Sequence, residues 1–175
     1  MAGPKHNYTL NAGIVLREVY RLASIMLAEP ALMRLASGDR DEPLYRLRDQ
    51  FLEDELVHQL LNLAISNRTQ IENMTDYRAT LGDQGFQSSG FSCGSLQPDS
   101  EKITREPLTF HEACHKIIHA RNIVAQADGT GVPEDMPMKM EVTLRGKKWQ
   151  GNDWVAHLDL LEYIRGSVHN FSDVR

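Results

Sequence analysis

The sequence predicts a mainly α protein: a bundle of four to five helices with a small antiparallel β hairpin inserted before the last helix. Three observations support this fold class. Apolar residues recur at helical spacing in four segments, and one short segment alternates with a period of two. The composition is that of an ordinary globular chain, with 41% hydrophobic and 25% charged residues. A helical bundle buries such apolar stripes economically.

The length and composition also limit the class of protein. A chain of 175 residues suits a single domain, 1–175, with its own core, and Cys93 and Cys114 are too few for a disulfide framework. The first residues lack the apolar core of a signal peptide, and no apolar run approaches the ~20 residues that cross a bilayer. We therefore expect a cytoplasmic protein without membrane contact. The net charge of −5 disfavours binding to duplex DNA through bulk charge.

The first predicted helix follows a flexible leader at 1–8 and runs from about Thr9 to Glu29. Thr9 or Asn11 can cap its start. Pro30 should end or break it, because proline cannot continue the hydrogen-bond ladder. We expect at most one further turn over 31–37. The inner stripe consists of Val15, Val19, Leu22 and Met26.

A second, central helix is predicted from about Asp41 to Ala79, with apolar residues on two sides. One side carries Leu44, Leu47, Phe51, Leu61 and Ile65, and the other carries Tyr45, Leu52, Leu56, Leu60 and Leu63. Such a helix is expected to pack between neighbours. His58 lies on the first side and is therefore expected to be an interior histidine.

Residues 80–107 are rich in glycine and serine and lack periodicity, which predicts a long mobile loop that covers or borders a site. A third helix is predicted at 108–120, where Thr109 can cap the start and Glu112 stands in the capping-box position. The stretch 121–150 is expected to be a β insertion. It holds an alternating strand at 138–144, a partner strand at 122–126 and a possible third short strand at 145–148. The last helix is predicted from about Asn152 or Asp153 to Val168.

The third helix carries three of the seven histidines, in the segment His111-Glu112-Ala113-Cys114-His115-Lys116-Ile117-Ile118-His119. Histidines four residues apart share a helix face. One hypothesis is a zinc-dependent hydrolase, because His111-Glu112-x-x-His115 has the zincin spacing of two ligands and a water-activating glutamate. His119 is too far along the axis to complete that site, at about 12 Å from His111. The candidates for a third ligand are Glu55, His58, His157 and Asp159.

A related hypothesis is a di-metal helical bundle. Glu55-x-x-His58 and Glu112-x-x-His115 both have the glutamate–histidine spacing of carboxylate-bridged metal sites. Glu18 and Glu162 would supply the carboxylates from the other two helices.

The segment Cys114-His115-Lys116-Ile117-Ile118-His119 also resembles the motif of the HEPN superfamily, written R-N-x-x-x-H and often seen as Arg-Asn-Lys-Ile-x-His. Lys116, Ile117 and His119 match the motif in place, whereas Cys114 and His115 replace its arginine and asparagine. The resemblance implies a homodimeric helical protein that acts on RNA, in many members as a metal-independent ribonuclease of a bacterial toxin–antitoxin, antiphage or stress system.

The site residues follow from that resemblance. His119 would be the acid/base, with His115 and Lys116 in support, and Arg105 or Arg121 would replace the missing phosphate-side arginine. Arg145, Lys147 and Lys148 form a basic cluster beside Trp149 and Trp154 that could bind substrate phosphates. No cofactor is expected under this hypothesis, and zinc only under the hydrolase hypothesis.

A non-catalytic alternative stays open. Histidines beside an apolar face often only hydrogen-bond the segment that covers them, here 80–107 or the β insertion. The chain would then be a helical interaction or ligand-binding module with a protein partner. Trp149 and Trp154 would close the core, and Cys114 would be a buried, inert thiol.

Overall fold

The computed structural model describes residues 10–37, 39–81, 86–127, 140–148 and 151–172, and it shows a mixed α/β fold. Four helices, α1 (Ala12–Leu35), α2 (Pro43–Leu81), α3 (Phe110–His119) and α4 (Leu160–Ser172), accompany five strands. The strands are β1 (Ser92–Gln97), β2 (Glu106–Thr109), β3 (Asn122–Ala127), β4 (Met140–Lys147) and β5 (Asp153–Asp159). The prediction of a mainly α bundle with one small hairpin is therefore wrong.

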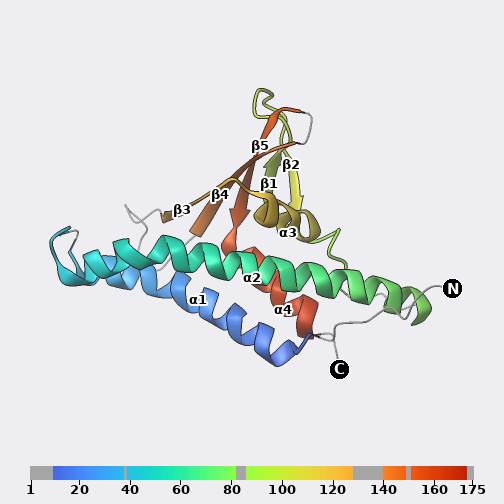
Figure 1. Ribbon diagram of the computed structural model, residues 1–175, viewed down its shortest axis with the longest axis horizontal. Helices are drawn as coiled ribbons and strands as arrows, with labels where there is room; N and C mark the ends of the chain where they lie inside the picture. Colours follow the sequence, from blue (N-terminus) through green and yellow to red (C-terminus); the bar gives the residue numbers. More distant parts are fainter. Residues whose placement is uncertain (1–9, 38, 82–85, 128–139, 149–150, 173–175) are drawn as a thin grey trace.

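The strands form one antiparallel sheet in the order β2-β1-β5-β4-β3. The sheet stands on the helices: α1 packs along α2 and α4, and α3 lies between the sheet and α2 (Figure 1). The helices and the sheet share a single hydrophobic core. It includes Leu22, Leu56, Leu60, Phe110, Ile117, Leu144, Leu158, Tyr163 and Phe171.

The last predicted helix is instead a strand followed by a helix. β5 alternates buried and partly exposed residues, with Trp154, Ala156 and Leu158 facing the core. Trp154 and Leu158 are four residues apart, a spacing that fits both a helix turn and a period of two. This spacing explains why the sequence predicts a helix over residues that form β5. The helix α4 begins only at Leu160.

The segment 80–107, predicted to be a mobile loop, contains the strand β1 and the first two residues of β2. β1 reads Ser92-Cys93-Gly94-Ser95-Leu96-Gln97, small and polar residues with weak intrinsic strand preference. Antiparallel pairing with β5 stabilises β1 in place of the strand preference that its own residues lack. At Gly94 φ is +139°, and a Cβ there would lie 2.0 Å from the carbonyl oxygen of His157, so only glycine fits this close approach.

The β insertion was predicted in part correctly. β3 pairs with β4 from Asn122 opposite Arg145 to Ala127 opposite Met140, as the alternation indicated. Residues 145–147 continue β4 and do not form a separate third strand. Residues 138 and 139 lie outside the described residues, as does the expected leader at 1–8.

The two long helices were located correctly but differ in detail. The side chain of Asn11 accepts a hydrogen bond from the Ile14 N–H and caps α1, as expected. Pro30, however, lies inside α1, which continues to Leu35, with Met26 and Glu29 buried before the proline and the C-cap residue Ala36 buried after it. On α2 the first of the two predicted apolar sides is largely uncovered: Leu47, Phe51 and Ile65 are each more than half exposed. His58, on the same side, is also exposed and not interior.

A buried polar cluster fixes α4 against α2. The amide of Asn67 donates to Ser167 Oγ at 2.9 Å, and Asn170 donates to Asn67 Oδ1 at 3.1 Å. Because all three side chains are buried, these hydrogen bonds set the register of the two helices. Among the described residues, no helix is both long and apolar enough to span a membrane.

Candidate functional site

Helix α3 positions the histidine segment. Its N-cap is Thr109, whose hydroxyl accepts from the Glu112 N–H at 3.3 Å, as the sequence predicted. Phe110, Ala113 and Ile117 face the core and have no exposed surface. The helix is thereby fixed in rotation, so that His119 is exposed, His115 is partly exposed and Lys116 is almost buried.

The C-terminal half of α3 borders the basic hollow, a surface cavity of about 900 Å³. Its walls come from α3, from the residue that leads into β3, and from the β4–β5 end of the sheet. They consist of His115, Lys116, His119, Arg121, Lys147, Lys148 and Trp154. Four cations and two imidazoles therefore surround one cavity, on a protein whose net charge is −5.

Lys116 is the central cation of the basic hollow. Only 8% of its surface is exposed, and its Nζ lies 3.0 Å from Glu112 Oε1 and 4.6 Å from the centroid of the Trp154 ring. A carboxylate and an aromatic face both stabilise an ammonium group at these distances. Because Lys116 also lines the basic hollow, these two contacts hold its positive charge at the wall of the cavity.

Trp154 is held in place by a glycine. Gly146 lies opposite Trp154 in the β4–β5 ladder, and a Cβ at that position would be 2.2 Å from Trp154 Cζ2. The indole ring of Trp154 therefore packs over Gly146, in the space that the side chain of any other residue at position 146 would occupy. This contact orients the ring face toward Lys116.

His115 and His119 form a pair on the same side of α3. Their rings meet edge to face with centroids 4.6 Å apart. Partial burial lowers the pKa of His115, and the nearby Glu112 carboxylate, which acts in the opposite direction, does not restore it. Burial also raises the pKa of Glu112, but the hydrogen bond and charge of Lys116 outweigh that effect and leave it below its usual value. A lowered pKa leaves an imidazole neutral at neutral pH and able to accept a proton, so His115 is suited to act as a base beside the ring of His119.

Cys114, which replaces the arginine of the motif, lies in the core. It has no exposed surface, and its Sγ lies 3.9 Å from the hydroxyl of Tyr163. Burial raises the pKa of this thiol to about 12, so it stays protonated at neutral pH and is unreactive, as expected.

The structure brings together six of the predicted site residues: His115, Lys116, His119, Arg121, Lys147 and Lys148. It does not bring the other two arginines to the hollow. Arg105 lies on an exposed stretch before β2, and Arg145 lies in β4 with its carbonyl accepting from the Arg121 N–H at 2.8 Å. Of the two candidates for the phosphate-side cation, Arg121 is therefore the one at the hollow.

Two contributions to the site were not foreseen. One is the contact of Trp154 with Lys116, and the other is Gly146, which makes that contact possible. Lys116 follows Glu112 by four residues, a spacing that favours an ion pair. The sequence could therefore have indicated the Glu112–Lys116 ion pair, but not the contact of Lys116 with Trp154. Trp149 lies outside the described residues.

The metal hypotheses find no complete ligand set in the described part of the chain, where no group of three or more histidine, cysteine, aspartate or glutamate side chains could hold an ion. His115 Nδ1 lies 3.6 Å from Glu112 Oε2, while His111 is exposed and does not line the hollow. The proposed additional ligands are dispersed. His58 pairs with Asn62 on α2, and His157 pairs with Glu141 on the sheet at 2.8 Å.

Comparisons with protein-family models, with curated proteins and with solved structures found no match for this chain.

Proposed function

We propose that the protein binds RNA phosphates in the basic hollow and cleaves the RNA without a metal ion. The observation that carries this proposal is the convergence of Lys116, Arg121, Lys147 and Lys148 with the His115–His119 pair around one cavity. Cations bind the phosphodiester, and imidazoles that titrate near neutrality transfer protons. The resemblance of this segment to the HEPN motif supports the same chemistry.

The cleavage step requires only a base and an acid. One imidazole accepts the proton of the ribose 2′-hydroxyl, whose oxygen then attacks the adjacent phosphorus. The bond from phosphorus to the 5′-oxygen breaks, and that oxygen takes a proton from an acid, leaving a 2′,3′-cyclic phosphate and a 5′-hydroxyl. We assign the acid/base role to His119, with His115 as its neighbour and Lys116 and Arg121 bound to the phosphate oxygens. The proposal includes the homodimer that the resemblance implies and a cytoplasmic site of action.

The test is RNA cleavage by the purified chain in the presence of EDTA. We expect a single-stranded RNA to be cut to products with cyclic phosphate ends, and His119→Ala to abolish the cut while its thermal unfolding stays unchanged. His111→Ala is the matched control, because His111 lies on the same helix, is exposed and does not line the hollow. Cleavage that EDTA abolishes, or that survives in His119→Ala, would contradict the proposal.

The alternative is a non-catalytic module that uses the same hollow to bind a phosphate-bearing partner. It is favoured by one observation: Lys116 is already neutralised by Glu112 and covered by Trp154, as a structural cation would be. RNA binding without cleavage, weakened in Lys147→Glu and unaffected in His119→Ala, would select this alternative.

A further inference from the structure

The α1–α2 groove is a small cavity between the two long helices, with a volume of about 210 Å³. Its apolar walls consist of Ile25, Ala28 and Leu32 of α1 and Leu47, Phe51 and Leu52 of α2. It shares no lining residue with the basic hollow. A cavity of about 150 Å³ accepts a benzene molecule, so this groove has room for one aromatic ring and the first atoms of its substituents.

Two buried side-chain oxygens of this helix pair have no hydrogen-bond partner among the described residues, Glu29 Oε2 and Gln59 Oε1. The Glu29 side chain lines the groove and is 1% exposed. Arg48 contacts only its other oxygen: Nε donates to Oε1 at 2.7 Å, and a second guanidinium nitrogen pairs with the same atom. A buried polar atom without a partner is costly. Because a carboxylate oxygen only accepts, the partner that suits Oε2 is a hydrogen-bond donor.

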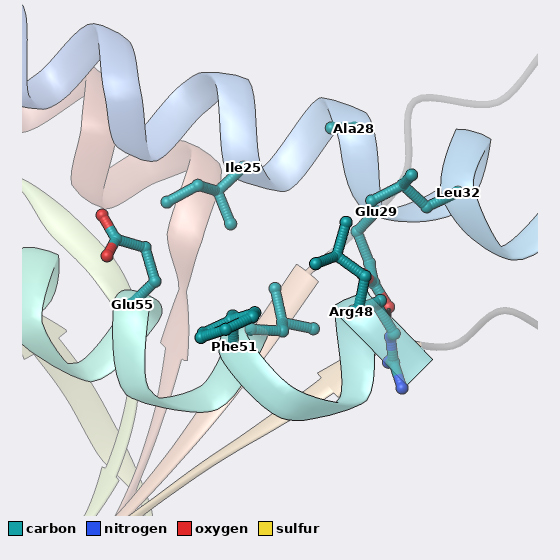
Figure 2. Close-up of a pocket in the computed structure, with 9 residues that line it drawn as sticks. Ile25, Ala28, Glu29, Leu32, Arg48, Phe51 and Glu55 are labelled. Carbon is teal, nitrogen blue, oxygen red and sulfur yellow. Dashed lines mark hydrogen bonds and ion pairs between the residues drawn. The ribbon is translucent and has the colours of Figure 1, made fainter. Parts of the chain in front are cut away.

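The other end of the groove carries a second carboxylate. Figure 2 shows Glu55 at the end opposite Glu29 and Arg48, with Ile25 and Phe51 between them. Within the described part of the chain no cation pairs with Glu55. Its Oε1 accepts from the Gln59 amide at 3.0 Å, which orients the carboxylate. Glu55 is also exposed, so this end of the groove presents an uncompensated negative charge.

Glu55 and Phe51 offer the same two kinds of group that surround the ammonium of Lys116. That ammonium lies between the Glu112 carboxylate and the Trp154 ring. Phe51 precedes Glu55 by four residues, so both side chains lie on one side of α2, and Phe51 is 52% exposed. A carboxylate beside an aromatic face binds an ammonium group. At this end of the groove, the ammonium would belong to a ligand.

We propose that the α1–α2 groove binds a small aromatic amine that carries a hydroxyl or N–H donor on its ring. The ammonium binds Glu55 and Phe51, the ring lies against the apolar walls, and the ring donor binds Glu29 Oε2. Charge sets this orientation. Glu29 is already neutralised by Arg48, so that end takes the neutral donor, and Glu55 takes the cation. The inference goes beyond the proposed action on RNA and does not depend on it.

The length of such a ligand fits the groove. Glu29 and Arg48 lie at the same level, and Glu55 follows Arg48 by seven residues, about 10 Å along the helix axis. A ring with an oxygen at one side and a two-carbon amine arm at the other, with a hydrogen bond of about 2.8 Å at each end, spans this distance. Water does not reach Glu29 Oε2, so a side chain must move for the donor to bind. Leu47 lines the groove and is 53% exposed, which leaves it free to change rotamer.

The experiment is isothermal titration calorimetry of the full chain with three matched probes. Tyramine has the ammonium, the ring and the hydroxyl, whereas phenethylamine lacks the hydroxyl and 4-ethylphenol lacks the ammonium. We expect saturable binding of tyramine in the micromolar to millimolar range. Each of the other two probes should bind at least about tenfold more weakly, because each loses a hydrogen bond to a charged group. Equal affinities for the three probes, or no saturable binding of tyramine up to about 10 mM, overturns the proposal.

Variants at the two ends test the orientation. Glu55→Gln removes a charge at an exposed position and should weaken tyramine binding at least about tenfold, while the affinity for 4-ethylphenol stays unchanged. Glu53→Gln is the matched control, since Glu53 is exposed on the same helix and does not line the groove; it should bind as the wild type does. The double variant Glu29→Leu, Arg48→Met should lose the preference for tyramine over phenethylamine.

The outcomes for the variants are equally decisive. Wild-type affinity for tyramine in Glu55→Gln, or an intact preference for tyramine in the double variant, overturns the proposal. The comparison of the three probes on the wild type needs no variant, so it decides the question even where a variant does not fold. Because the titrations contain no RNA, their result is separate from the outcome of the cleavage test.

Discussion

The ammonium group of Lys116 lies 4.6 Å from the centroid of the Trp154 ring, and both side chains line the basic hollow. A buried cation is costly unless charged or polar partners surround it. Here the partners are Glu112 on one side and the indole face on the other. Because an ammonium has three N–H donors, Lys116 can keep both partners and still donate to a phosphate.

Lys116→Met should therefore weaken RNA binding while keeping an unbranched side chain against Trp154. A hydrogen bond to a charged group contributes about 1.5–3 kcal/mol, so we expect a loss of affinity of roughly tenfold or more. The slope of log K against log salt should become less steep by about 0.7, the value for one phosphate contact on a single strand. Fluorescence anisotropy with a labelled single-stranded RNA over a salt series measures both quantities.

The control for this variant is Lys102→Met, since Lys102 is an exposed residue outside the hollow. It should leave the slope unchanged. An unchanged slope in Lys116→Met as well would show that Lys116 does not contact phosphate.

Gly146→Ala should destabilise the protein, because the new Cβ would lie 2.2 Å from Trp154 Cζ2 and 2.5 Å from Trp154 Cε2. The ring must move, and overpacking of this kind costs about 1–3 kcal/mol. Denaturant unfolding gives the free-energy change, and near-UV circular dichroism reports the change around the indole. Gly90→Ala is the control, since its Cβ would meet nothing nearer than 3.7 Å and should change stability by less than about 0.5 kcal/mol. Equal stabilities of the two variants would contradict the assigned role of Gly146.

The long helices and the site segment could be predicted from sequence because their signals are local. Asn11 and Thr109 are caps that act within one turn, and the alternation in β4 needs no knowledge of its neighbours. The same holds for the His115–His119 pair, whose spacing of four residues places both rings on one side of α3. Lys147 and Lys148 were predicted from their clustering in the sequence.

The sheet could not be predicted, because its strands depend on distant partners. Gly94 and Ser95 of β1 have little strand preference of their own and are held by Leu158 and His157 of β5, more than sixty positions later. The contact between Lys116 and Trp154 joins a helix to a strand that was expected to be a helix. To predict this contact, β5 has to be identified as a strand, and the local sequence pattern does not indicate that.

Acid should reduce the stability of the folded protein through His115. Its pKa is lowered by burial in the folded state, so the unfolded chain binds more protons between that value and the usual 6.5. The contribution of His115 to stability is therefore complete above pH 6.5 and is lost as the pH falls through the folded pKa. Thermal unfolding at pH values of about 7.5 and 5.5 measures the loss, which should be smaller in His115→Gln.

The control for the acid effect is Lys147→Gln, which changes the charge of the hollow without removing an imidazole. It should retain the wild-type difference between the two pH values. RNA affinity should change in the opposite direction and increase in acid, because phosphate favours the protonated imidazole. If stability and RNA affinity both decreased in acid, His115 would not be part of the phosphate site.

The buried ion pair between Glu29 and Arg48 gives a last test, at the groove end shown in Figure 2. Glu29 is 1% exposed, and the pKa of Arg48 is raised by its hydrogen bond to that carboxylate. Arg48→Met leaves a buried carboxylate without its cation and should cost about 3–5 kcal/mol, whereas the double variant Glu29→Leu, Arg48→Met should recover most of that loss. The matched control is Arg46→Met, which breaks an exposed pair with Asp41 and should cost less than about 1 kcal/mol. Urea unfolding of the wild type, the single variants Arg48→Met and Glu29→Leu, the double variant and Arg46→Met completes the cycle, and additive single-variant losses would show that the two charges are not coupled.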